Sequence, residues 1–334
     1  MPIHAAGLGN AIMDALVRLD DDAILTELGL TRGQMHPVDH DRWEAVHERI
    51  ASLGVEVHSG GSCANTMQTM GLLGADVLYC GQIGDDAQGR AYASAMTANV
   101  GKHHLVVHPS FKTGKCLSLI SPKDGERTML TDLGAAVHLP TIGDFAGRIA
   151  ESRLLHLTGY LFLGGPVREA AFEAVQTAVR AGIPISLDVA DPFVARTIRE
   201  DILALFRDHV DIAFLNREEA EIVTGRSPEE ALVELSEYVD TVVVKLGSQG
   251  SLVRRNGVTS RISVYPASVA DTTGAGDSYA GAFLYGYLQG WTAAQCGELG
   301  SRVAALTVGQ VGAVVRNQNG LNAARELVRG GPAA

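Results

Sequence analysis

Asp271-Thr272-Thr273-Gly274-Ala275-Gly276-Asp277 runs directly into the apolar stretch Ser278–Leu284, which predicts a helix over Gly276–Gly290. Small residues before a helix leave backbone N–H groups uncovered at the positive end of the helix dipole, and such groups bind anions. Asp277 falls in the first helical turn, where the dipole keeps a carboxylate ionised and able to accept a proton from a hydroxyl group. A base beside an anion hole indicates phosphoryl transfer. The alternative is a tight turn followed by an ordinary acidic helix start.

Two better-known phosphate-binding motifs are absent. Thr113-Gly114-Lys115-Cys116 lacks the earlier glycine of a Walker A loop and has a cysteine where the magnesium-binding hydroxyl belongs. The pattern G-x-G-x-x-G also fails, because Gly7-Leu8-Gly9-Asn10-Ala11-Ile12 ends in isoleucine. P-loop and dinucleotide-binding proteins are therefore excluded as interpretations.

Short β-branched runs alternate with longer amphipathic stretches, which predicts βα units around a mostly parallel sheet. The expected strands are Asp76–Cys80, Arg153–Leu157, Ile183–Asp188, Ile212–Leu215 and Thr241–Lys245. The expected helices are Asn65–Leu73, Gly89–Asn99, Pro166–Ala181, Arg217–Thr224, Pro228–Val239 and Gly276–Gly290.

Two segments, approximately 15–58 and 112–138, interrupt this alternation within what we expect to be a single domain over residues 1–334. Polar and apolar residues alternate in Cys116–Ile120 and in Arg127–Leu130. We expect a small antiparallel excursion that forms a lid over the carboxyl edge of the main sheet, where open α/β folds bind ligands.

Two further glycine clusters carry polar side chains suited to a polyol. Gly60-Gly61-Ser62-Cys63-Ala64-Asn65 precedes an expected helix, and an asparagine both donates and accepts hydrogen bonds. Asn10 and Asp14 follow Gly7 and Gly9 at even spacing, which places both on one face of a strand. A simple turn and cap, and a carboxylate at a solvent-facing strand end, are the respective alternatives.

Two segments at the ends of expected strands favour nucleotide contacts. Asn216-Arg217-Glu218-Glu219 follows the run Ile212–Leu215, and Lys245-Leu246-Gly247-Ser248-Gln249-Gly250 follows Thr241–Val244. A capped acidic helix start explains the first segment equally well. An ordinary hairpin turn explains the second.

The charge balance limits the partners. The chain has 334 residues, and 27 Lys and Arg against 38 Asp and Glu give a net charge of −11, which disfavours nucleic acid and anionic membrane surfaces. No apolar run approaches the roughly 18 residues of a membrane span, and the first residues lack a basic stretch followed by an apolar one. Cys63, Cys80, Cys116 and Cys296 are widely spaced, which indicates free thiols. We expect a cytoplasmic protein.

Taken jointly and in order, Gly60–Gly84, Asn216–Glu219 and Asp271–Ala282 resemble the signatures of the ribokinase-like, or PfkB, family of carbohydrate and nucleoside kinases. The resemblance spans nearly the whole chain. It implies a three-layer α/β/α sandwich with a mostly parallel central sheet and a small β lid. It also implies that Asp277 is the base and that the anion hole consists of Gly274, Ala275 and Gly276.

The same resemblance implies ATP and magnesium as cofactors. Asn216 and Glu219 would organise magnesium, mainly through ATP and water, and the nucleotide would be lined by Lys245, Gly247 and Gly250. Lys245 departs from the threonine often found at this position in ribokinases. A potassium or other monovalent cation site, if present, would use Asp271, Thr273 and Gly312.

The acceptor segments resemble those of adenosine kinases, which share the pattern G-G-S-x-x-N. The substrate-binding residues implied are Asn10, Asp14, Gln34, Gly60, Gly61, Asn65, Leu133, Ala135 and Tyr160. Asp14 and Asn65 would bind the ribose diol, and Tyr160 or Phe162 would stack on the purine. A place for both aromatic residues in the core is the alternative.

The expected activity is therefore phosphorylation of the 5′-hydroxymethyl of a ribonucleoside, adenosine giving AMP. The alternatives are a kinase for ribose, fructose or a related sugar, and a non-catalytic binding protein, which the joint presence of Asp277, Asn216 and Glu219 disfavours. A phosphosugar is disfavoured because few Lys or Arg lie near the motifs in the sequence. We expect a monomer, or a homodimer that pairs through an exposed lid strand.

Overall fold

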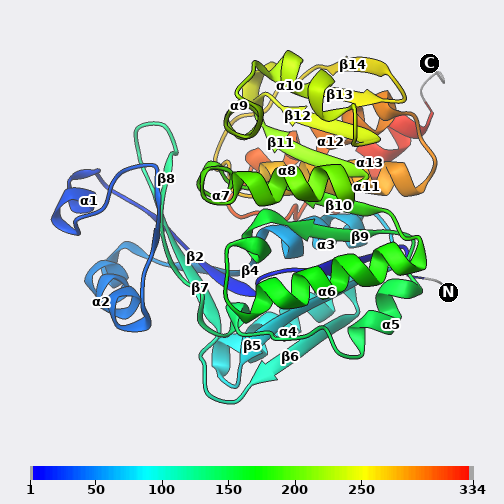
Figure 1. Cartoon of the computed structure of the whole chain (residues 1–334). Coiled ribbons are helices and arrows are strands. Elements are labelled where there is room, and N and C mark those ends of the chain that lie inside the picture. Colours follow the sequence, from blue (N-terminus) through cyan, green and yellow to red (C-terminus); the bar gives the residue numbers. More distant parts are fainter. Residues whose placement is uncertain (1–2, 331–334) are drawn as a thin grey trace.

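The computed structural model describes residues 3–330 and is built on a sheet of nine strands in the order β14-β13-β12-β11-β10-β9-β1-β5-β6 (Figure 1). The strands from β12 to β6 pair in parallel, and β13 and β14 add an antiparallel hairpin. In sheet order the bounds are Val258–Ile262, Ser251–Arg255, Thr241–Lys245, Ile212–Asn216, Ile185–Asp188, Leu155–Thr158, Ala5–Leu8, Val77–Gly84 and His103–His108.

Helices cover both faces of this sheet, and each face has its own apolar core. One face packs against α5 (Phe145–Ala150), α6 (Pro166–Ala181), α7 (Pro192–Thr197), α8 (Arg199–Asp208), α9 (Arg217–Thr224) and α10 (Pro228–Leu235). The other packs against α3 (Ser62–Leu72), α4 (Ala87–Val100), α11 (Ala275–Leu288) and α12 (Ala293–Val308), with α13 (Gln318–Arg329) outside them. The predicted three-layer α/β/α sandwich is confirmed.

Residues at the helix starts explain where α6 and α9 begin. Pro166 starts α6, because proline tolerates the first helical turn, and Asn216 caps α9 with its side chain. Both helices have the bounds expected from the sequence. No helix within residues 3–330 is long and apolar enough to cross a membrane.

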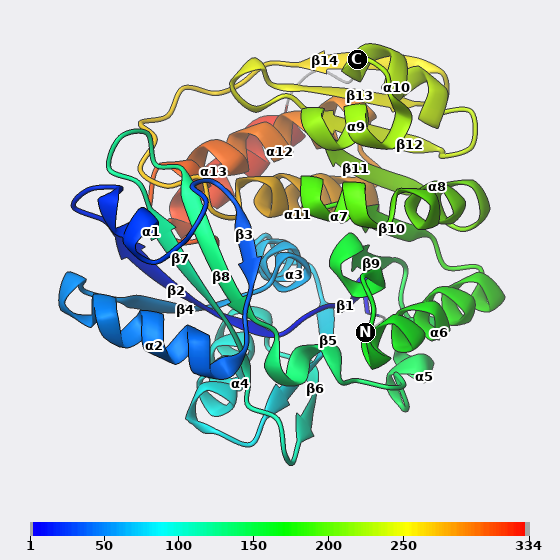
Figure 2. The same cartoon turned by 60° about the vertical axis from the view of Figure 1, so that its left-hand side comes forward.

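The lid is a second sheet of five strands in the order β3-β8-β7-β2-β4 (Figure 2). Their bounds are Met35–Pro37, Arg127–Asp132, Gly114–Ile120, Ile12–Arg18 and Glu56–Gly60. The expectation of an antiparallel lid was wrong in part, because β2 pairs in parallel with β7 and β3 with β8. β2 and β7 leave the same edge of the main sheet, shortly after the parallel strands β1 and β6, and so run in the same direction.

The two faces of the lid differ, as alternation along a strand requires. Ala15, Val17, Leu117, Leu119 and Leu130 face outward and pack beneath α1 (Ala23–Glu27) and α2 (His40–Ile50). Neither helix was expected from the sequence. The residues between them in the strands face the main body. Of the lid surfaces that a homodimer could use, the outer face is thus covered, and the edge strands β3 and β4 are left.

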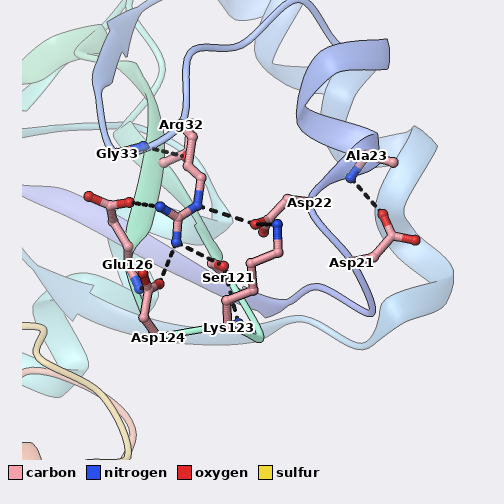
Figure 3. Close-up of polar contacts among 10 residues, drawn as sticks. Asp21, Asp22, Ala23, Arg32, Gly33, Ser121, Lys123, Asp124 and Glu126 are labelled. Atoms are coloured by element: carbon pink, nitrogen blue, oxygen red, sulfur yellow. Dashed lines mark hydrogen bonds and ion pairs between the residues drawn. The ribbon is translucent and has the colours of Figure 1, made fainter.

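A group of ion pairs fastens the segment around α1 to the β7–β8 turn (Figure 3). The Arg32 guanidinium contacts Asp124, Glu126 and, at 3.2 Å, Asp22. Lys123 adds a second cation 2.9 Å from Asp22. Partly exposed pairs contribute little individually, so this network chiefly selects one position for the segment while the apolar core beneath α2 supplies the stability.

Replacing Trp43 by alanine tests whether the apolar core beneath α2, rather than the ion pairs of Arg32, supplies the stability of the lid. Trp43 is 2% exposed in the lid core and stacks on His47, with the Lys115 ammonium 4.1 Å from the indole centroid. We expect a loss of about 3–5 kcal/mol of lid stability, measured by urea unfolding and hydrogen exchange, because a large buried ring leaves a cavity. The control Val57→Ala removes a lid side chain that is 51% exposed and should change little. Equal effects of the two substitutions would contradict a separate lid core.

Candidate active site

A cavity of about 730 Å³ lies between the lid and the carboxyl ends of the central strands. The last residues of four neighbouring strands, Thr158, Asp188, Asn216 and Lys245, line its floor. Of the residues expected from the sequence, it brings together Asn10, Asp14, Gly61, Asn65, Leu133, Tyr160, Asn216, Glu219, Lys245, Gly247, Thr273, Gly274, Gly276 and Asp277. Gln34, Gly60, Ala135, Gly250, Asp271, Ala275 and Gly312 do not line it.

The start of α11 presents uncovered backbone amides where the sequence predicts an anion hole, with one difference in the residues. Gly274 is the N-cap at a φ of 70°, a conformation that favours glycine, and Asp277 lies in the first turn. Within residues 3–330, the amides of Gly274, Gly276 and Asp277 donate to no acceptor, whereas the Ala275 amide donates to the Thr272 carbonyl at 3.3 Å. The uncovered N–H groups therefore belong to Gly274, Gly276 and Asp277. The predicted set had Ala275 where the structure has Asp277.

The Asp277 carboxylate is held from α3. Asn65 Nδ2 donates to Asp277 Oδ2 at 2.9 Å, and Ser62 Oγ donates to Asp277 Oδ1 at 2.7 Å. Burial raises the pKa of Asp277, and these two hydrogen bonds act in the opposite direction. The sequence assigned Asn65 to a substrate diol, but in this structure its amide nitrogen is committed to Asp277. Asn65 Oδ1 is buried without a partner within residues 3–330 and is free to accept a hydrogen bond.

Asn216 and Glu219 form the N-terminal cap of α9, and this cap places a carboxyl group in the cavity wall. Glu219 N donates to Asn216 Oδ1, Asn216 N donates to Glu219 Oε2, and Asn216 Nδ2 donates to Glu219 Oε1. Asn216 and Glu219 can therefore form a helix cap and line the cavity at the same time. Glu219 is 1% exposed, and burial raises its pKa to about 8, opposed by the nearby Lys245 ammonium.

The polar end beneath the lid contains Asn10, Asp14 and Arg127. Burial raises the pKa of Asp14 to about 7, with Arg127 opposing the shift and Asp277 adding to it. A Cβ on Gly60 would lie 2.0 Å from Asp14 Oδ2, so this glycine makes room for the carboxylate rather than lining the cavity. Asn10 Oδ1 is buried and has no partner within residues 3–330, which leaves an acceptor for a polar ligand.

The cavity also has apolar lining residues. They include Met35, Leu133, Val137 and Leu163, and Tyr160 lines the same cavity. The Tyr160 hydroxyl donates to Asp191 Oδ2 at 3.0 Å, which fixes the ring. Phe162, the other residue considered for stacking, is 1% exposed and packs in the core.

Asp271, Thr273 and Gly312 lie together in the structure, and the cation site that the resemblance implied there stays a prediction. Asp271 Oδ1 accepts from Thr273 N and Oγ1, and Asp271 Oδ2 accepts from Gly312 N at 2.9 Å. These bonds fix the loop before α11. Both carboxylate oxygens are already engaged, so a monovalent cation would have to share them. In the described part of the chain, no group of three or more His, Cys, Asp or Glu is arranged to hold a metal ion.

Sequence reasoning missed Ser62, Arg127, Asp188 and Asp191 as cavity residues. Two cationic side chains line the cavity, Arg127 on β8 and Lys245 on β12, and only Lys245 belongs to a segment that the sequence assigned to ligand phosphates or nucleotide. Arg127 reaches the loop before α11 and donates to Thr273 Oγ1 at 3.2 Å. One signal was available for Asp188, which ends the expected strand Ile183–Asp188, as Lys245 ends the expected strand Thr241–Lys245.

Comparison with known proteins agrees with this geometry. Residues 38–319 match the pfkB family of carbohydrate kinases. A 5-dehydro-2-deoxygluconokinase from Shouchella clausii is 32% identical over 260 residues, which cover 75% of this chain and 80% of that protein. The crystal structure of adenosine kinase from Sinorhizobium meliloti has 31% identity and a TM-score of 0.90, over 98% of this chain and 100% of that one. A probable sugar kinase from Rhizobium etli has 29% identity and a TM-score of 0.91, over 98% and 99%. With its ribokinase-like sandwich, its lid and a carboxylate beside uncovered helix amides, the chain belongs to the pfkB family of carbohydrate kinases.

Proposed function

We propose that this kinase uses ATP to phosphorylate the 5′-hydroxymethyl of a ribonucleoside, with adenosine as the preferred acceptor. The apolar slot formed by Met35, Leu133, Val137 and Leu163, with Tyr160 at its side, carries the proposal. A free sugar presents hydroxyl groups in every direction and would leave this wall facing polar atoms, whereas a purine presents a flat apolar face. The polar end then receives the ribose, with Asp14 and Asn10 as acceptors for its hydroxyl groups.

The reaction follows from the positions of the charged groups. The acceptor oxygen forms a bond to the γ-phosphorus while the bond from phosphorus to the β–γ bridging oxygen breaks, so that ADP leaves with the electron pair. Asp277 takes the proton of the acceptor hydroxyl. The amides of Gly274, Gly276 and Asp277 stabilise the negative charge on the transferred group.

The wall by Asn216 and Glu219 fits a magnesium ion bound mainly through ATP and water. Both side chains line the cavity with oxygen atoms, which magnesium prefers, but they already bond to each other. Bound there, magnesium would neutralise phosphate charge. Potassium dependence through Asp271 stays a prediction.

A sugar acid is the second candidate acceptor, and Arg127 favours it. The guanidinium lies in the cavity beside Asp14, where it could pair with a carboxylate on the acceptor. A kinase for a sugar acid is also among the relatives of this chain.

The decisive experiment is a turnover screen with ATP against adenosine, other nucleosides, ribose, fructose, fructose phosphates and 5-dehydro-2-deoxygluconate. We expect the highest kcat/KM with adenosine. Tyr160→Ala should then raise the KM for adenosine about tenfold, because base stacking is worth roughly 1–3 kcal/mol, while Tyr160→Phe keeps the ring and serves as control. A preference for a free hexose or for the sugar acid would overturn the acceptor assignment.

Asp277→Asn tests the base. The change keeps size and shape but removes the proton acceptor, so kcat should fall about 10²- to 10⁴-fold while the Kd for ATP stays within a factor of a few. Steady-state kinetics and calorimetric titration provide the two readouts. The exposed Asp144→Asn is the matched control. Near-normal turnover of the Asp277 variant would exclude the mechanism.

Asp14 should make stability depend on pH in the absence of substrates. Its pKa is about 7 in the folded chain against an ordinary value of 3.8, so the folded state retains a proton that the unfolded state loses. The stability contribution of Asp14 is therefore complete below pH 3.8 and is lost as pH rises to about 7. Asp14→Asn should be increasingly more stable than wild type between these values in urea unfolding, and Asp144→Asn should show no such trend. A constant difference across the range would contradict the raised pKa.

A further inference from the structure

Lys245 lies against the first turn of α11. It is the last residue of β12, its side chain is 16% exposed, and its ammonium donates to Asp188 Oδ2 at 2.7 Å. A Cβ placed on Gly276 would lie 3.2 Å from Lys245 Nζ. The ammonium is therefore beside the uncovered amides of the anion hole, and the glycine at position 276 leaves room for it.

Acidic side chains surround the Lys245 ammonium, and among them Asp188 has the largest effect on its pKa. Burial lowers the pKa of Lys245, but Asp188, Glu219 and Asp277 together raise it by more, so the net shift is upward. The ammonium thus remains protonated in a buried site. The Lys245 ammonium offers three N–H donors. Asp188 Oδ2 accepts one of them, so the ammonium has more donors than Asp188 alone can use.

Asp188 is built to aim the ammonium. Its Oδ1 accepts from the Ala190 amide at 3.1 Å, which leaves Oδ2 for Lys245. Ala190 has a φ of 74°, in the left-handed region that costs an alanine of the order of 1 kcal/mol. The strained residue lines the cavity together with Asp188. The left-handed backbone of Ala190 therefore costs conformational free energy at the residue whose amide orients the Asp188 carboxylate.

Arg127, the other cationic side chain that lines the cavity, comes from the lid. Arg127 belongs to lid strand β8, whereas Lys245, Asp188 and the start of α11 all belong to the main body. Any displacement of the lid carries Arg127 away from the anion hole. Lys245 keeps its position relative to the amides of α11, so it is the fixed positive charge at this site.

From these contacts we infer that Lys245 is a catalytic residue whose ammonium binds the transferred γ-phosphoryl group beside the α11 amides, and that Asp188 is the positioning residue that holds it there. This inference rests on the proposed kinase function and deepens it. Lys245 keeps its proton throughout. As the bond to the acceptor oxygen forms and the bond to ADP breaks, its charge compensates negative charge on the equatorial phosphoryl oxygens while Asp277 takes the acceptor proton.

Lys245→Met, Lys245→Arg and Asp188→Asn test the inference in the full-length enzyme. Loss of one charge-stabilising donor typically costs about 10²- to 10³-fold in kcat, so we expect that loss for Lys245→Met with the acceptor KM unchanged. Lys245→Arg keeps the charge and should recover part of the rate. Asp188→Asn should reduce kcat about tenfold or more with little change in acceptor KM, because the ammonium is then less well held. Lys102→Met, which removes an exposed lysine paired with Asp76, is the control.

A binding measurement separates this inference from the kinase proposal. Wild type should bind a non-hydrolysable ATP analogue more tightly than ADP, and Lys245→Met should lose most of that preference, since only the analogue has a γ-phosphate. Thermal unfolding checks that each variant is folded, and if Lys245→Met does not fold, Lys245→Gln replaces it. A folded, uncharged variant with wild-type kcat and wild-type preference would overturn the inference while leaving the kinase activity intact. If no acceptor is turned over by wild type, the kinase proposal fails, and the binding preference alone still decides whether Lys245 contacts the γ-phosphate.

Discussion

The hydrogen bonds from the first turn of α3 to Asp277 are the contact on which the rest of the site depends. Asn65 and Ser62 reach this carboxylate across more than two hundred residues of sequence, and they join the starts of two helices. The helices pack closely, because a Cβ on Gly281 of α11 would lie 2.6 Å from the Thr66 carbonyl oxygen of α3. A glycine inside a helix costs up to about 1 kcal/mol, and here it permits the approach that places Asp277 next to Asn65 and Ser62.

The acidic composition of the chain is compatible with the proposed triphosphate ligand, because the positive groups are concentrated at one place. The net charge is −11, yet uncovered amides at the start of α11 and two cationic side chains face the same cavity. Amides contribute partial charges without the long side chains that would make the surface basic. The net charge therefore disfavours an extended polyanion partner, and it says nothing against a small ligand held inside the cavity.

The features predicted from sequence were those that neighbouring residues determine. Gly274 and Asp277 define the start of α11, and Asn216 with Glu219 defines a helix cap, so both could be placed by spacing alone. Contacts between distant segments could not be placed in this way. The pairing of Lys245 with Asp188 depends on two strands lying side by side in register, and the sequence shows only that each residue ends a strand. The parallel pairing of β2 with β7 and the helices over the lid were missed for the same reason, since they follow from tertiary packing.

The site is divided between two bodies, and its charges follow that division. Asp14 on β2 and Arg127 on β8 belong to the lid, and Arg127 opposes the upward shift in the pKa of Asp14. Asp277 and Lys245 belong to the main body, and Arg127 reaches that body through a hydrogen bond to Thr273 Oγ1 in the loop before α11. A displaced lid would carry Asp14 and its counter-charge Arg127 away together, so Asp14 would regain contact with water without losing its partner. In the mechanism proposed above, the acceptor oxygen is aligned with Asp277 only while the lid holds Asp14 over the main body.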